Sequence, residues 1–195
     1  MQLTCKELPN GIRIVHQEIP HTRLVHCGFI LNIGSRDEDQ EQEGLAHFWE
    51  HMAFKGTQKR KTFHILNRLE SLGGELNAYT TKEKVCFYAS VLKDHYDKAA
   101  ELLYDITFHS TFPDKQIERE RQVILEEMAM YRDSPDDAIQ DELDALVFEH
   151  HALGRNILGT EETVSNFHHQ DFIEFISSRL DTSQLVFSVV GNISF

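Results

Sequence analysis

The chain has 195 residues, of which 41% are hydrophobic and 26% are charged, as is typical of one soluble globular domain with its own core. Its formal net charge of −13 argues against a nucleic-acid binder, which needs a basic face. The charge is explained by solubility, and attraction of basic peptides is the alternative. No apolar run is long enough to span a bilayer, and three scattered cysteines without a CxxC pair indicate free thiols rather than disulfides.

The first third of the chain has the pattern of β-strands. Residues 3–8 and 12–19 flank the turn signal PNG at 9–11, and this arrangement predicts a hairpin. Residues 23–35 are rich in β-branched and apolar side chains, which predicts a third, central strand. A charged loop over residues 36–43 then leads to the first predicted helix.

The middle of the chain predicts two helices and a strand. The first helix covers about residues 43–55 and is ended by Gly56. Thr62 is a candidate N-cap for a second helix over residues 63–72. Residues 75–92 show partial period-2 alternation, which predicts one long strand.

The second half of the chain predicts mainly helices, and Asp94 is the candidate N-cap of the first of them. The predicted elements are helices over residues 95–109, 115–132, 136–150 and about 160–178, then a closing strand over 184–193. Strands that come first and helices that cluster later predict an α+β fold, with helices packed on one face of a mostly antiparallel sheet. Because no linker or repeat interrupts residues 1–195, we expect a single domain.

The most informative motif is AHFWEHMAFKGT at residues 46–57. His47 and His51 lie one helical turn apart on the same face, so that both imidazoles can bind one ion. Glu50 lies beside that face, where its carboxylate can hold a water molecule. This inverted HxxEH arrangement is a known zinc peptidase motif, whereas the alternative is a solvated helix face with harmless contacts between its side chains.

A zinc ion that keeps one position open for water needs a third protein ligand. The helix predicted over residues 115–132 offers several carboxylates. Glu120 and Glu127 are seven residues apart and share a face, whereas Glu126 points about 100° away from Glu127. Helix geometry alone does not decide which glutamate reaches the metal.

Six segments of the chain match one known family in order. They are GSRDE (34–38), GLAHFWEHMAFKGT (44–57), GGELNAYTTKEKVCFYA (73–89), ERERQVILEEMAM (118–130), LGRNILGTEE (153–162) and SVVGNIS (188–194). Together they resemble the family of pitrilysin, insulin-degrading enzyme and mitochondrial processing peptidase, most of all its processing-peptidase and bacterial two-domain branch. The resemblance covers nearly the whole chain and implies a LuxS/processing-peptidase-like metallopeptidase fold, although Trp49 stands where the family usually has leucine.

The resemblance implies a zinc endopeptidase with one Zn²⁺ in the domain. His47 and His51 correspond to two zinc ligands, and Glu127, which lies 76 residues after His51, corresponds to the third. Glu50 corresponds to the general base that accepts a proton from water and passes it to the leaving amine. Glu120 corresponds to a glutamate that supports the ligands by tuning their charge or orienting a histidine, and its alternative role is an ordinary surface carboxylate.

The resemblance also implies how an extended peptide is bound. In the family, the edge strand that matches LNAYT presents its backbone to the substrate, which adds to the sheet as a further strand. Asn77, Ala78 and Tyr79 are the residues expected to contact the peptide. An ordinary strand edge without a substrate is the alternative.

Family members build the active chamber from at least two homologous domains, so we expect a C-terminal domain or a partner subunit that this chain lacks. The isolated chain is then expected to bind zinc but to cleave extended or unfolded peptides poorly. A homodimer and a non-catalytic module for assembly or peptide binding remain alternatives. The expected substrates are basic peptides, and neither nucleic acid nor a membrane is an expected partner. Without a signal-peptide pattern at the amino terminus, a cytoplasmic location is expected.

Overall fold

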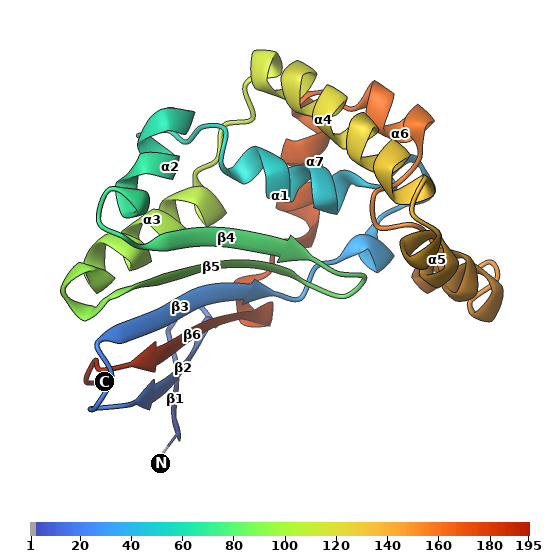
Figure 1. Cartoon of the computed structure of the whole chain (residues 1–195). Helices are drawn as coiled ribbons and strands as arrows, with labels where there is room; N and C mark the ends of the chain where they lie inside the picture. Colours follow the sequence, from blue (N-terminus) through green and yellow to red (C-terminus); the bar gives the residue numbers. More distant parts are fainter. Residues whose placement is uncertain (1–2) are drawn as a thin grey trace.

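The computed structural model describes residues 3–195 and shows a six-stranded sheet with helices packed against it (Figure 1). The strand order across the sheet is β1-β2-β6-β3-β5-β4. Of the pairings in this sheet, only β2 with β6 is parallel, so the predicted α+β fold with a mostly antiparallel sheet is confirmed. The strands are β1 (Leu3–Glu7), β2 (Arg13–Glu18), β3 (Leu24–Leu31), β4 (Glu75–Thr80), β5 (Val85–Leu92) and β6 (Leu185–Gly191).

Residues 75–92, predicted as one strand, form a hairpin instead. β4 and β5 pair antiparallel with Asn77 opposite Tyr88, and the Thr81 N–H donates to the Lys84 carbonyl at 2.8 Å to close the turn. The sequence prediction is wrong here because the turn contains no glycine or proline. The hairpin makes β4 an edge strand of the sheet (Figure 1).

The helices lie on one side of the sheet, and α5 projects from the rest of the molecule (Figure 1). The helix predicted from Thr160 to about residue 178 is divided in two, because Phe167 and His168 adopt extended backbone conformations. None of the helices within residues 3–195 combines the length and the apolar character needed to cross a membrane. The helices are α1 (Leu45–Ala53), α2 (Thr62–Glu70), α3 (Tyr96–Phe108), α4 (Asp114–Arg132), α5 (Pro135–Val147), α6 (Glu161–Asn166) and α7 (His169–Arg179).

Two of the predicted N-caps are wrong. Thr62 is the first residue of α2, and its hydroxyl donates to the Lys55 carbonyl at 2.8 Å. Asp94 lies in a short 3-10 turn before α3, whose N-cap residue is His95. In both places the N-cap is the neighbour of the predicted residue: Lys61 precedes Thr62, and His95 follows Asp94.

Helix α1 is fixed between the sheet and the other helices by two buried aromatic side chains. The ring of Trp49 packs edge-on against Phe87 of β5, with 5.8 Å between centroids, and against Phe175 of α7, at 6.5 Å. Phe48 packs edge-on against Phe172 at 5.2 Å. Full burial of an apolar side chain of this size stabilises a fold by about 1.5–3 kcal/mol, so α1 has a well-defined position.

A carboxylate from the preceding loop caps the first turn of α1. The helix begins after Gly44, which has a φ of +94° and no side chain that could cap it. The buried side chain of Glu38 takes this role: Oε2 accepts from the Gly44 N–H at 2.9 Å and Oε1 from the Ala46 N–H at 2.7 Å. The guanidinium of Arg155 donates to the Glu38 carbonyl at 2.7 Å. Glu38 thus joins the GSRDE segment to the start of the helix that carries the HxxEH motif.

Burial raises the pKa of Glu38 to about 8, although the N–H groups of Ala46 and Gly44 oppose the shift. Because the folded protein holds this proton more tightly than the unfolded chain, Glu38 contributes stability that is fully present below its ordinary pKa and is lost as the pH rises toward 8. In the Glu38→Gln variant this side chain does not ionise, so we expect no such fall in stability as the pH rises.

Urea unfolding of both proteins at about pH 5 and about pH 8 measures the effect. The free energy of unfolding of the wild type should fall between these pH values by more than about 1 kcal/mol relative to that of the variant, since one pKa unit corresponds to about 1.4 kcal/mol. Equal pH dependence in the two proteins would contradict a raised pKa of Glu38.

Candidate metal centre

His47, His51 and Glu127 come together where α1 packs against α4. The Nε2 atoms of the two histidines are 3.2 Å apart. One carboxylate oxygen of Glu127 lies 3.8 Å from Nε2 of His47, and the other lies 3.5 Å from Nε2 of His51. Within residues 3–195, this is the one group of three such side chains whose ligand atoms are close enough to share a metal ion.

These distances and atom types fit a zinc ion. Tetrahedral zinc, with bonds of about 2.0–2.2 Å, places its ligand atoms about 3.3–3.6 Å from one another. Nδ1 of His51 lies 3.0 Å from a carboxylate oxygen of Glu120, so this nitrogen carries the ring proton and Nε2 keeps its lone pair. Burial, aided by the neighbouring His51, lowers the pKa of His47 to about 3, which keeps that ring neutral as a ligand must be.

Glu120 supports His51 from the side away from the three ligand atoms. Its Oε1 faces Nδ1 of His51, and its Oε2 lies 2.6 Å from the ammonium of Lys55. Burial on its own raises the pKa of Glu120, but the hydrogen bonds from His51 and Lys55 outweigh it and hold the pKa below its usual value. Glu120 is buried, so the reading as a surface carboxylate does not apply. Sequence reasoning missed Lys55, which lies just after the end of α1, four residues after His51.

Glu50 lines a cavity beside the three ligand atoms and is held there by the edge strand β4. The hydroxyl of Thr80 donates to Oε2 of Glu50 at 2.6 Å, and no hydrogen bond from residues 3–195 reaches Oε1. Burial raises the pKa of Glu50, and the bond from Thr80 opposes this shift. The sequence alone gave no sign of this contact, because Thr80 and Glu50 are 30 residues apart on different elements.

A cavity of about 270 Å³ lies beside the ligand cluster, with His47, Glu50 and Glu127 in its wall. Of the three strand residues predicted to contact a substrate, Ala78 and Tyr79 line this cavity, whereas Asn77 does not. The side chain of Asn77 instead accepts a hydrogen bond from the Ala78 N–H at 2.8 Å. The lining residues are His47, Glu50, Ala78, Tyr79, Thr80, Glu127, Tyr131, Asp141, Asn156, Ile157 and Leu158.

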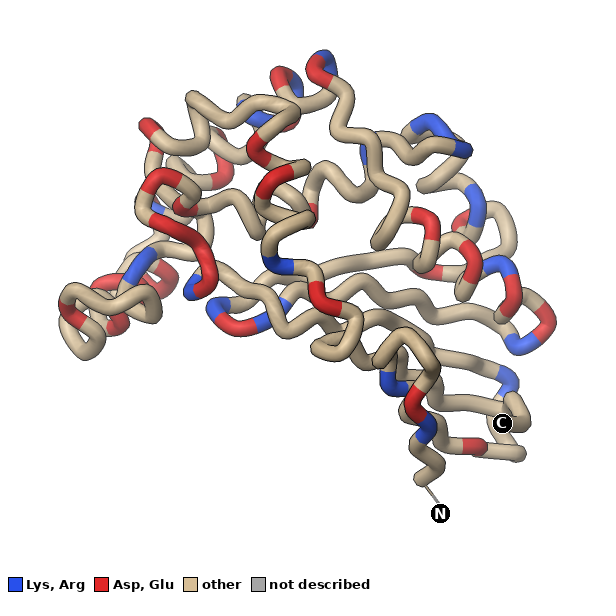
Figure 2. The backbone as a smooth tube through the Cα atoms, turned by 180° about the vertical axis from the view of Figure 1, so that it is seen from behind, with Lys and Arg blue, Asp and Glu red and all other residues tan. Residues whose placement is uncertain are grey.

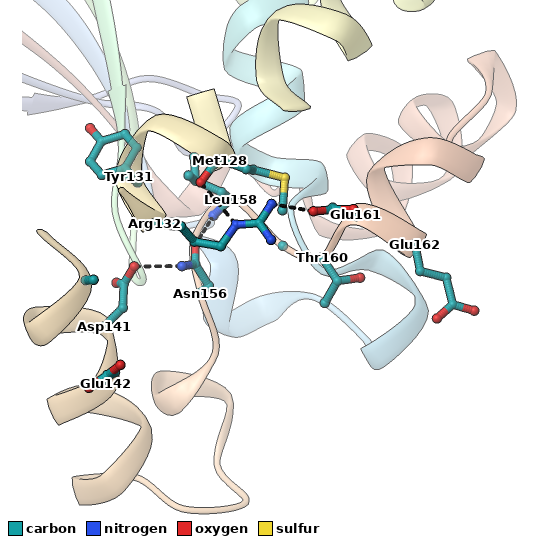
Figure 3. A pocket seen from close by; sticks show the side chains of 12 residues that line it. Met128, Tyr131, Arg132, Asp141, Glu142, Asn156, Leu158, Thr160, Glu161 and Glu162 are labelled. Atoms are coloured by element: carbon teal, nitrogen blue, oxygen red, sulfur yellow. Dashed lines mark hydrogen bonds and ion pairs between the residues drawn. The ribbon is translucent and has the colours of Figure 1, made fainter. Parts of the chain in front are cut away.

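A second cavity of about 550 Å³ adjoins the first and shares its wall at Tyr131, Asp141, Asn156 and Leu158 (Figure 3). Its lining is rich in carboxylates from α5 and from the start of α6. Asn156 donates to Asp141 at 2.6 Å, and Arg132 pairs with Glu161 (Figure 3). Sequence reasoning did not find this cavity, since its walls come from three separate segments of the chain. The acidic residues that line it are Asp141, Glu142, Glu161 and Glu162.

An inverted HxxEH helix that meets a glutamate from a second helix, on a sheet of this topology, defines the class of zinc metallopeptidase domains. The sequence profile of the insulinase family, peptidase family M16, matches residues 13–161 of this chain. The chain therefore belongs to the insulinase family of peptidases, as its sequence motifs predict.

Two proteins that are similar in sequence to nearly the whole chain are named as a protease and as a subunit of a peptidase. A Bacillus subtilis (strain 168) protein named as an uncharacterized zinc protease is 41% identical over 191 residues, which is 98% of this chain and 46% of that protein. The Bos taurus mitochondrial-processing peptidase subunit beta is 36% identical over 195 residues, which is 99% of this chain and 39% of that subunit. The chain thus spans about half the length of these relatives, or less.

Solved structures share the fold. A protease from Helicobacter pylori superposes with a TM-score of 0.93 at 22% identity, covering 99% of this chain and 47% of that one. A peptidase M16 inactive domain from Pseudomonas fluorescens superposes with a TM-score of 0.91 at 17% identity, covering 100% of this chain and 47% of that one. Because a domain described as inactive has the same fold, the fold alone does not establish catalysis, and the side chains of the site must carry that inference.

Proposed function

We propose that this chain is the zinc-binding domain of an endopeptidase that hydrolyses extended peptides or unfolded segments. The observation that supports it most is the meeting of three ligand atoms, from His47, His51 and Glu127, beside a cavity whose wall includes the side chain of Glu50. His47, His51 and Glu127 would hold one zinc ion, which supplies Lewis-acid chemistry by polarising a carbonyl group and acidifying water.

In this proposal Glu50 moves the proton. Thr80 holds Oε2, so Oε1 accepts a proton from water as the water oxygen attacks the scissile carbonyl carbon. The C–N bond then breaks, and the same oxygen gives the proton to the leaving amine nitrogen. Glu120 positions the ring of His51 through Nδ1 and so keeps Nε2 directed toward the other two ligands.

The edge strand and the acidic cavity together favour an extended, basic substrate. β4 pairs with β5 on one side and forms the end of the sheet on the other, so a peptide can add to it as a further strand. Ala78 and Tyr79 would place that peptide beside Glu50, and Asn77 would contact it from the neighbouring position. The carboxylates in the adjoining cavity, with Asp141 in the shared wall, would attract Lys or Arg side chains of the peptide.

We further propose that residues 1–195 form one domain of a larger assembly in the cytoplasm. The relatives are about twice as long as this chain, which supports a homologous companion domain that completes the chamber. A homodimer is the other way to complete it. A non-catalytic module for assembly or peptide binding is the second candidate function, and the inactive Pseudomonas fluorescens domain with the same fold favours it.

The test is to measure zinc content and cleavage of a basic, unstructured peptide by the chain alone and by the chain joined to its companion domain. We expect one zinc per chain in both forms and cleavage at least about tenfold faster in the joined form, since substrate positioning needs both halves. Absence of zinc would overturn the metal site. Zinc without cleavage in either form would favour the non-catalytic module.

Replacing Thr80 with valine is expected to slow peptide cleavage while zinc binding stays unchanged. Valine keeps the shape of threonine but removes the hydroxyl that holds Oε2 of Glu50. Since a well-positioned general base contributes about 10²–10⁴-fold, a misplaced one should lower kcat by about tenfold or more. In the joined form, Thr80→Ser, which keeps the hydroxyl, should retain most of the activity, and an equal loss in both variants would contradict this role of Thr80.

A further inference from the structure

Helix α5 carries an apolar stripe that no part of residues 3–195 covers. Ile139, Leu143, Leu146 and Val147 are each more than half exposed, and Leu146 reaches 79%. At 100° per residue these four side chains occupy an arc of about 100° on one face of the helix. Four neighbouring exposed aliphatic residues on a single helix face are a typical feature of an interaction site.

The stripe faces away from the domain, which is the reverse of the usual amphipathic helix. The half-buried residues of α5 are Ala138, Asp141 and Asp144, on the opposite face. Asp141 accepts a hydrogen bond from Asn156, and Asp144 pairs with Lys82. Polar contacts therefore fix the orientation of α5, and this orientation turns its apolar face to the outside.

The stripe has an acidic border. α5 contains no lysine or arginine, and acidic segments gather along it (Figure 2). Asp136 and Glu142 are both exposed: Asp136 lies in line with the stripe at its amino-terminal end, and Glu142 lies along one side of it. A surface that fits this face must therefore combine an apolar centre with positive charge at its edges.

We propose that the α5 stripe is a docking surface for a cationic amphipathic helix of the companion domain. Apolar side chains of that helix would cover Leu143 and Leu146, and its lysine or arginine residues would pair with Asp136 and Glu142. The assignment to the companion domain rests on the proposed function, and the relatives of about twice this length have room for it.

Charge and geometry disfavour other occupants. A second copy would bring the same acidic border against itself, and the formal charge of −13 on each chain adds repulsion. An anionic membrane surface repels the same carboxylates. A substrate in the two cavities meets α5 at Ala138, Asp141 and Glu142, and the four apolar residues of the stripe line neither cavity.

The probe is a synthetic helical peptide with leucines at i, i+3, i+4 and i+7 and lysines on both flanks. The control peptide has glutamates in place of the lysines. Binding to the chain is measured by fluorescence anisotropy. We expect the lysine peptide to bind at least tenfold more tightly than the glutamate peptide. The double variant Leu143→Gln and Leu146→Gln should weaken it at least tenfold, and Asp136→Asn with Glu142→Gln severalfold.

Phe63→Gln is the matched control, because Phe63 is 70% exposed on α2, a separate helix. It should leave binding unchanged, and zinc content should be the same in all variants. In the chain joined to its companion domain the peptide should bind at least tenfold more weakly, since the stripe is then covered. No binding, equal binding of both peptides, or full binding to the joined form would overturn the proposal. The proposal would also be overturned if the chain formed dimers, or bound to anionic vesicles, and if Leu146→Gln abolished that dimer or that binding.

Discussion

Replacing His51 with alanine is expected to lower the zinc affinity of the chain by more than about a hundredfold. Loss of a partner that only supports a zinc ligand already costs about 10–100-fold in affinity, and removal of a ligand itself costs more. The same loss is expected for Glu127→Gln, because an amide lacks the charge that balances the ion. Competition with a chromophoric zinc chelator measures the affinity of each variant.

Helix α4 offers a matched control for this experiment. Glu126 is the neighbour of Glu127 but is exposed and takes no part in the cluster. Glu126→Gln should therefore bind zinc as the wild type does, whereas Glu120→Gln should bind it about 10–100-fold more weakly. If Glu126→Gln and Glu127→Gln bound zinc equally, the assignment of the third ligand would be wrong.

These variants test the step at which helix periodicity is least informative. Periodicity alone places His47 and His51 on one face, since both residues lie on one short helix. It does not choose among Glu120, Glu126 and Glu127, because that choice depends on how two helices cross. The resemblance to the insulinase family supplied the choice, and the distances from Glu127 to both Nε2 atoms support it.

Contacts that side chains make across a loop or between two elements were beyond sequence reasoning. Glu38 caps α1 across a loop, and Thr80 reaches Glu50 from the neighbouring strand. No periodic pattern marks either contact, because each depends on the tertiary arrangement. The turn between β4 and β5 was missed for a local reason, since it is made of polar residues without glycine or proline.

Helix α5 shows the same limit in another form. Its stripe of apolar residues indicates an amphipathic helix, and such a stripe normally turns toward the core. Here the ion pair of Asp144 with Lys82 and the hydrogen bond of Asp141 with Asn156 orient the helix the other way. The sequence therefore predicted the helix, and only the structure shows which face is exposed.

Replacing Glu50 with glutamine is expected to lower kcat by about 10²–10⁴-fold, the contribution typical of a general base, with zinc content unchanged. Glutamine keeps the size of the side chain and an oxygen that can accept a hydrogen bond from the Thr80 hydroxyl, but it does not take a proton from water. The measurement is peptide cleavage by the chain joined to its companion domain, with zinc determined in the same samples.

Comparison with His51→Ala distinguishes the loss of a general base from the loss of a zinc ligand. Both variants should lose activity, but only His51→Ala should lose zinc, because Glu50 is not among the three ligands. Glu41→Gln, a change at an exposed position outside the cavity, is the control and should keep both properties. If Glu50→Gln lost zinc as well, its carboxylate would be a ligand rather than a base. If it kept full activity, another group would have to accept the proton, and a catalytic role for Glu50 would be excluded.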